Sequence, residues 1–208
     1  MRRALVAGTL ALFLLAGCDD AGQTDPDEDF MPGPGPGPSK VKVDTPELVA
    51  LKDEVGMEDC RPGPGGGALP SVTVPCLGGG TAVDLSSLKG PMALSFWASW
   101  CTECKQEMPV LQDFHEQYGD QVPLLGVDFT DPFPGSALEL ARETGATYPS
   151  VADPGGDLQE TDEFAKVIGL PYVALIDGDG EIAYAKFGVV ESVDELTELV
   201  DEHLGAAP

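Results

Sequence analysis

Basic residues are scarce in this chain of 208 residues, which has 11 lysines and arginines against 36 aspartates and glutamates and a formal net charge of −25. Proteins that bind nucleic acid, or that dock on anionic lipid through their surface, need an excess of positive charge. Both partner classes are therefore excluded. So many acidic side chains are typical of a well-solvated surface, and they form no recognisable site for an acidic substrate.

Histidine is rarer still, with only His115 and His203 in the whole chain. A zinc site normally combines four cysteine or histidine ligands at close spacing. Of the five cysteines, only Cys101 and Cys104 lie close together, and neither histidine stands near them at ligand spacing. The spacing of Cys101 and Cys104 is therefore not interpreted as half of a zinc site. We expect no metal and no other cofactor.

A long apolar run is also absent, because the most apolar stretch, Ala4–Ala16, is too short to span a bilayer comfortably as a permanent helix. It follows two arginines and ends in Leu15-Ala16-Gly17-Cys18, as in an export signal. This tetrapeptide resembles the bacterial lipobox, whose cysteine is lipidated. We therefore predict a lipoprotein signal peptide over 1–17 and lipidation of Cys18. An ordinary signal peptide with an incidental Cys18 is the alternative.

Residues 18–44 are dominated by aspartate, glycine and proline, and proline alternates with glycine from Pro32 to Pro38. Glycine at every second position does not fit collagen, and such a composition cannot bury enough apolar surface to fold. We predict a disordered linker over 18–44, which at roughly 3 Å per residue would hold the domain tens of ångströms from the membrane. A folded domain is expected over 45–208, with an N-terminal extension at 45–80.

Four cysteines remain once Cys18 is assigned to lipid, and an exported chain lies where disulfides persist. Cys60 and Cys76 flank a loop rich in glycine and proline. We predict a structural disulfide between them, worth roughly 3 kcal/mol for a loop of about 15 residues. Two separate buried thiols are the alternative.

Helix and strand patterns alternate along the rest of the chain. Helices are predicted over 45–54, 102–118, 136–145, 161–168 and 192–204, and strands over 71–76, 92–98, 122–129, 148–152, 172–177 and 181–187. Ser136 and Ser192 each begin a capping-box pattern, and Gly178-Asp179-Gly180 is typical of a hairpin turn. This alternation predicts an α/β fold in three layers, with a central mixed β-sheet flanked by helices.

The chemistry concentrates in Cys101-Thr102-Glu103-Cys104, where a buried strand ends and a helix begins. The first turn of a helix carries partial positive charge, so a thiolate at Cys101 is stabilised. Two intervening residues bring Cys104 round the first turn, within bonding reach. Cys101 is therefore expected to attack a disulfide, and Cys104 to resolve the mixed disulfide. A purely structural disulfide is the alternative.

The segment Phe96–Cys104 resembles the active site of the thioredoxin superfamily, especially its extracytoplasmic TlpA-like and ResA-like thiol-disulfide oxidoreductases. A second matching motif, Gly169–Asp177, follows about seventy residues later, and the resemblance covers about two-thirds of the chain. It implies a thioredoxin-like fold, a cis Pro171 against the cysteine pair, and a Leu170 backbone that pairs with an extended substrate. By the same resemblance, Trp100 offers an apolar platform beside the site.

The sequence departs from this family at two positions. Many members have proline directly before the second cysteine, where this chain has Glu103; its carboxylate opposes a thiolate at Cys101, whereas Lys105 favours one. Thioredoxin also has a buried acid on the preceding strand, where this chain has Ser95. Asp128 and Asp131 are candidates to replace that acid as proton acceptor for Cys104, although a solvated loop role is favoured for each.

The resemblance implies a thiol-disulfide oxidoreductase that is lipid-anchored at the extracytoplasmic face of the bacterial cell membrane. We expect it to reduce disulfides of exported proteins, in cytochrome c maturation among other processes, with electrons from a membrane redox donor. The same scaffold also serves disulfide-forming oxidants. A thiol peroxidase and a non-catalytic binding lipoprotein are further alternatives.

Overall fold

The computed structural model describes residues 39–206. The predicted signal peptide, Cys18 and most of the predicted linker lie outside these residues. Val43, inside the expected linker, is only 4% exposed and packs with the core residues of the domain. Its apolar side chain gains from leaving water, so the packed part of the chain begins before the predicted boundary at residue 45.

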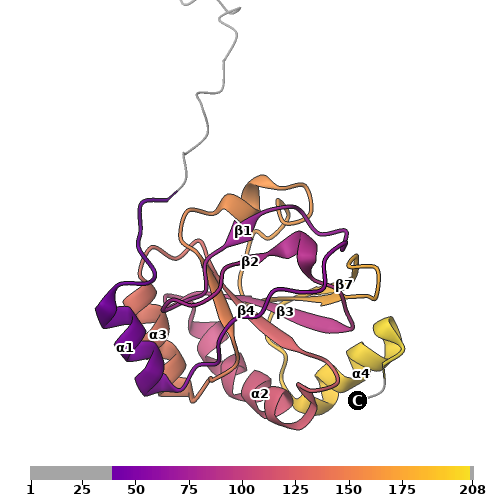
Figure 1. The fold of residues 1–208 in the computed structure, drawn as a ribbon. Coiled ribbons are helices and arrows are strands. Elements are labelled where there is room, and N and C mark those ends of the chain that lie inside the picture. Colours follow the sequence, from indigo (N-terminus) through magenta and orange to yellow (C-terminus); the bar gives the residue numbers. More distant parts are fainter. Residues whose placement is uncertain (1–38, 207–208) are drawn as a thin grey trace, which may run out of the picture. The chain divides into compact units, whose positions relative to one another are not determined.

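The described chain alternates helices with strands, as predicted (Figure 1). In order, the elements are α1 Pro46–Val55, β1 Thr73–Val74, β2 Val83–Asp84, the 3-10 helix η1 Leu85–Ser87, β3 Met92–Trp97, α2 Thr102–Tyr118, β4 Leu124–Phe129, α3 Pro134–Thr144, β5 Ser150–Asp153, the 3-10 helix η2 Asp157–Glu160, β6 Tyr172–Ile176, β7 Ile182–Phe187 and α4 Val193–Leu204.

Five strands form the central sheet in the order β5-β4-β3-β6-β7. Strands β3, β4 and β5 run parallel, whereas β6 and β7 are antiparallel to their neighbours. Phe96, near the end of β3, pairs with Tyr172, the first residue of β6. The carboxyl end of β3 and the entry to β6 therefore meet at one edge of the sheet. This mixed sheet confirms the predicted fold class.

The two faces of the sheet are covered differently (Figure 1). All four α-helices contribute to the apolar cluster on one face, into which Trp97 points. The other face carries Phe96 and is covered by the β1–β2 pair, the 3-10 helices and the turns around Phe164. The molecule thus has three layers, with the helices gathered on the face that also holds Cys101 and Cys104.

Two local predictions are wrong. Residues 161–168 form a bend and turns rather than a helix, although Phe164 and Val167 are buried three residues apart. The capping box predicted at Ser136 is absent, since α3 already begins at Pro134, with Phe133 at the N-cap. Proline suits the first helical position, where its missing N–H costs nothing. Gly145 ends α3 in the left-handed conformation, as predicted.

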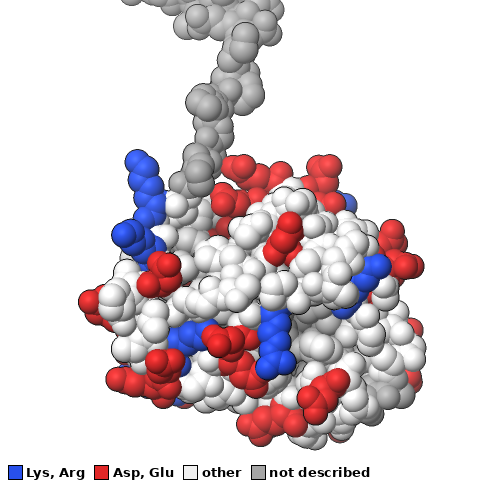
Figure 2. All heavy atoms as spheres, in the orientation of Figure 1, with Lys and Arg blue, Asp and Glu red and all other residues white. Residues whose placement is uncertain are grey.

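Carboxylates are spread over the visible face of the domain, with a few basic side chains between them (Figure 2). This distribution agrees with the expected well-solvated acidic surface. Among residues 39–206, no helix combines the length and the apolar character needed to cross a bilayer. Within the same range, no three His, Cys, Asp or Glu side chains are arranged to hold a metal ion.

Candidate active site

The predicted cysteine pair lies at the junction of β3 and α2. Every residue of β3 is buried, so the strand is a rigid support for the loop that follows it. Cys101 is the N-cap of α2, and its Sγ accepts a hydrogen bond from the Cys104 backbone N–H at 3.1 Å. This is the polar first turn that favours negative charge on sulfur.

Cys101 and Cys104 are joined by a disulfide. Cys104 is fully buried, whereas Cys101 is 5% exposed and lines the adjacent cleft, so Cys101 is the more accessible of the two. An incoming thiolate or disulfide therefore meets Cys101 before Cys104. The order of attack by Cys101 and resolution by Cys104 stays a prediction, which this asymmetry favours.

Trp100 and Glu103 both lie at the surface beside the pair. The Trp100 side chain is 58% exposed, although it directly precedes the nearly buried Cys101. Glu103 is exposed in the first turn of α2, where a carboxylate is compatible with the helix dipole. Trp97, the last residue of β3, instead packs in the core.

Leu170 and Pro171 lie at the same edge of the sheet as Cys101, because Pro171 immediately precedes the residue that pairs with Phe96. The Leu170–Pro171 peptide bond is cis, as the family resemblance implied. The Pro171 carbonyl accepts a hydrogen bond from the Gly188 N–H at 3.0 Å, which joins this loop to the end of β7. Leu170 is half-buried against the core.

Asp131 is tied to the active-site loop. One of its carboxylate oxygens accepts from the Ser99 N–H at 2.6 Å, two residues before Cys101, and the other accepts from the Phe133 N–H at 3.0 Å. Asp131 is completely buried, so the solvated role favoured from the sequence is wrong. Its place just after the end of β4 brings its carboxylate to the neighbouring β3–α2 loop.

Asp128 is also buried rather than solvated, and neither of its carboxyl oxygens has a hydrogen-bond partner within the described structure. It pairs with Trp97 across the β3–β4 ladder. Burial, reinforced by the nearby carboxylates of Asp131 and Asp153, raises the pKa of Asp128 well above its ordinary value. Asp128 is therefore a weak acid on the strand next to the one that carries Ser95.

Glu107 is a site residue that the sequence reasoning missed. It is 1% exposed, one helical turn beyond Cys104, and its Oε1 accepts from the Val190 N–H at 2.8 Å. Burial raises the pKa of Glu107 to about 7. Glu107 could have been found from the sequence, because its spacing places it on the same helical face as Cys104, Met108 and Leu111.

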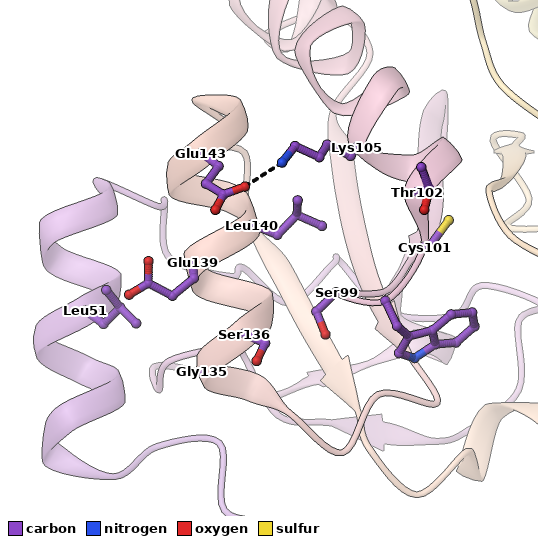
Figure 3. A pocket seen from close by; sticks show the side chains of 11 residues that line it. Leu51, Ser99, Cys101, Thr102, Lys105, Gly135, Ser136, Glu139, Leu140 and Glu143 are labelled. Carbon is purple, nitrogen blue, oxygen red and sulfur yellow. Dashed lines mark hydrogen bonds and ion pairs between the residues drawn. The ribbon is translucent and has the colours of Figure 1, made fainter.

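A cleft of about 630 Å³ opens beside Cys101 (Figure 3). The start of α2, with Trp100 and Cys101, forms one side, and α3, with Leu140, forms the other. Leu51 of α1 also lines the cleft. The N-terminal extension, which the sequence did not connect to the site, therefore contributes to the surroundings of Cys101.

The second predicted disulfide, Cys60–Cys76, is confirmed. Lys52 of α1 is almost fully buried against it, with Nζ 3.5 Å from Cys76 Sγ and 2.9 Å from the Gly79 carbonyl oxygen. Lys52 also forms an ion pair with Asp59 at 2.8 Å. These contacts attach α1 to the disulfide-bonded loop.

A sequence model described as the AhpC/TSA family matches residues 66–185, which is more than half of the chain. The chain belongs to the AhpC/TSA family.

Curated relatives support a narrower grouping within the thioredoxin-like proteins. The chain is 31% identical over 129 residues to thiol-disulfide oxidoreductase ResA of Bacillus cereus, an alignment that covers 60% of this chain and 68% of that one. It is also 31% identical over 136 residues to a thiol:disulfide interchange protein DsbE homolog of Paracoccus denitrificans, covering 64% and 72% of the two chains.

Solved structures agree with these relatives. The crystal structure of StoA from Bacillus subtilis superposes with a TM-score of 0.51 at 27% identity, covering 62% of this chain and 98% of that one. The family predicted from the sequence is therefore confirmed. This AhpC/TSA member is a thioredoxin-like thiol-disulfide oxidoreductase of the ResA, StoA and DsbE type.

Proposed function

We propose that Cys101 and Cys104 are the catalytic pair of this oxidoreductase and that it reduces disulfides of exported proteins. The observation that carries the proposal is the disulfide at the N-terminus of α2, with Cys101 lining the cleft and Cys104 fully buried behind it. Only a reactive pair gains from this position, because the helix end stabilises a thiolate that a structural disulfide never forms.

The reaction transfers two electrons from the dithiol to the substrate. The Cys101 thiolate attacks one sulfur of the substrate disulfide, which forms a mixed disulfide and releases the other substrate sulfur as a thiolate. Cys104 then loses its proton and attacks the Cys101 sulfur, so that the Cys101–Cys104 disulfide forms and the second substrate thiolate leaves. Both substrate thiolates take up protons from water or from nearby acids.

Four neighbouring residues support this reaction in our proposal. The Leu170 backbone pairs with an extended substrate segment, and the cis Pro171 shapes the cleft beside the cysteines. Trp100 provides an exposed apolar surface next to Cys101. Glu103 lies in the first turn of α2, where it moderates the thiolate-stabilising effect of the helix end.

The proposed location is the extracytoplasmic face of the bacterial cell membrane. Lipid on Cys18 would anchor the chain, residues 18–44 would act as the spacer, and a membrane redox donor would return the pair to the dithiol form. Precursors of c-type cytochromes are among the proposed substrates. The signal-like sequence at the N-terminus and the ResA-like and DsbE-like relatives support this location.

The reduction potential of the Cys101–Cys104 pair, equilibrated with dithiothreitol or glutathione buffers, tests the direction of electron flow. A value of about −200 to −270 mV, as in glutaredoxins and thioredoxin, supports a reductant, whereas about −120 mV identifies an oxidant and overturns that part of the proposal. Cys101→Ser and Cys104→Ser should each abolish turnover of insulin disulfides, while the Cys60→Ala/Cys76→Ala control retains it. Insulin turnover that survives in both active-site variants would refute the assignment of Cys101 and Cys104 as the catalytic pair.

Membrane anchoring is tested separately by growing producing cells with a labelled fatty acid. Wild-type protein should carry the label and sediment with membranes, and Cys18→Ser should lose both properties. A wild-type protein that remains unlabelled overturns the anchoring proposal without affecting the redox one.

A further inference from the structure

The cleft beside Cys101 has a mixed lining that is suited to a particular kind of side chain. Its apolar residues are Leu51, Trp100 and Leu140, which come from α1, the β3–α2 loop and α3. Glu139 and Glu143, one turn apart on α3, supply carboxylates to the same lining; in Figure 3, Glu139 lies toward Leu51 and Glu143 toward Lys105. A lining that combines apolar side chains with carboxylates matches a long side chain with an apolar stem and a cationic head.

The charges within the cleft favour a cation over an anion. Lys105 is the one basic residue among the lining residues, and it already forms an ion pair with Glu143 at 2.6 Å. Glu139 is paired with Arg142, which does not line the cleft. Both ion pairs join side chains that are roughly half exposed, so each is weak and can be exchanged for a new partner.

Two further features reinforce this preference. Trp100, 58% exposed at the mouth of the cleft, offers a ring face to which a cation is attracted. The whole chain carries a formal charge of −25, so a cationic partner is drawn toward it over a longer range. The positive end of α2 lies at Cys101 itself, where it serves the sulfur rather than the outer part of the cleft.

From this lining we infer that the cleft is a specificity site for a lysine or arginine close to the reacting cysteine of the substrate polypeptide. The inference rests on the proposed function, because the substrate must first be bonded to or approaching Cys101. In the mixed disulfide, the stem packs against Leu140, and the cationic head lies near Glu143 and Glu139, next to Leu51 of α1. The N-terminal extension thereby takes part in selecting substrates.

The test uses the reduced full chain in detergent and three short peptides, each held as a disulfide-linked dimer. The peptides are identical except for the residue beside cysteine, which is lysine, alanine or glutamate. The second-order rate constant of their reduction is followed by tryptophan fluorescence. For the wild type, we expect the lysine peptide to react about tenfold faster than the glutamate peptide at low salt.

The ratio of the two rates within one variant is the decisive quantity, because a general loss of activity or folding cancels in it. Glu139→Gln/Glu143→Gln should reduce the ratio several-fold, whereas Lys105→Met should increase it. The matched control Asp201→Asn/Glu202→Gln removes two exposed charges from α4, outside the cleft. It should leave the ratio within about twofold of the wild type.

Each contrary result overturns a distinct statement. A ratio that is unchanged in Glu139→Gln/Glu143→Gln, or that falls equally in the α4 control, overturns the specificity site and leaves the oxidoreductase intact. If none of the peptides and no insulin disulfide is reduced, the proposed function itself fails.

Discussion

The Ser99 backbone N–H donates a 2.6 Å hydrogen bond to Asp131 Oδ2, which connects the loop before Cys101 to the loop after β4. The second oxygen of Asp131 accepts from the Phe133 N–H at the start of α3. One buried carboxylate therefore positions two walls of the cleft relative to the reactive sulfur.

Asp131→Ala should destabilise the protein by about 2 kcal/mol or more, because the Ser99 and Phe133 amides lose their acceptor. We also expect slower disulfide exchange, since the loop that leads to Cys101 is no longer held. Urea unfolding and insulin reduction measure the two effects. Asp113→Ala, which removes an exposed carboxylate from α2, is the control. Equal stability of the two variants would show that the Asp131 contacts are unimportant.

Glu107 should make the stability of the protein depend on pH. Its pKa is 4.5 in the ordinary case and about 7 in the fold, so the folded state binds the extra proton within this window. The stabilising contribution of the Glu107 carboxyl is fully present below pH 4.5. It is lost as the pH rises to about 7, which lowers the free energy of unfolding by about 3 kcal/mol in total.

Glu107→Gln keeps an acceptor for the Val190 N–H but does not titrate. Its unfolding free energy should therefore change less than that of the wild type between pH 4.5 and 7. Urea unfolding at several pH values measures the difference. Parallel profiles for the two proteins would contradict a raised pKa at this position.

Asp128→Asn should stabilise the protein at alkaline pH. The wild-type carboxyl has a raised pKa, so its favourable contribution is present below the ordinary value of 3.8 and declines as the pH rises above it. The asparagine variant has no buried charge to form, and its advantage should grow with pH. Thermal unfolding at pH 5 and pH 8 measures this trend, and an advantage that shrinks at the higher pH would refute it.

Loss of the Cys60–Cys76 disulfide should cost stability but not chemistry. Cys60→Ala/Cys76→Ala is expected to lower the unfolding free energy by roughly 3 kcal/mol, because the unfolded chain is no longer cross-linked. The rate of insulin reduction at low temperature should stay within about twofold of the wild type. An inactive but folded variant would indicate that the second disulfide takes part in the electron transfer.

Much of the fold followed from local pattern. The buried run of β3, the amphipathic repeat of α2 and the hairpin between β6 and β7 each depend on neighbouring residues, and each was predicted close to its observed bounds. The segment 161–168 was mispredicted because the helical preference of so short a stretch is weak, and turns bury Phe164 and Val167 equally well.

The sequence by itself determined the reactive pair, since two cysteines separated by two residues at a strand-to-helix junction need only local geometry to form their disulfide. It also indicated the second disulfide and the family. Only the tertiary structure decided what surrounds the sulfur. Asp131 is 27 or more residues from the cysteines and Leu51 about fifty, yet both lie at the site. Burial and proximity across the chain, which set the pKa values of Glu107 and Asp128, exist only once the sheet and its helices have packed.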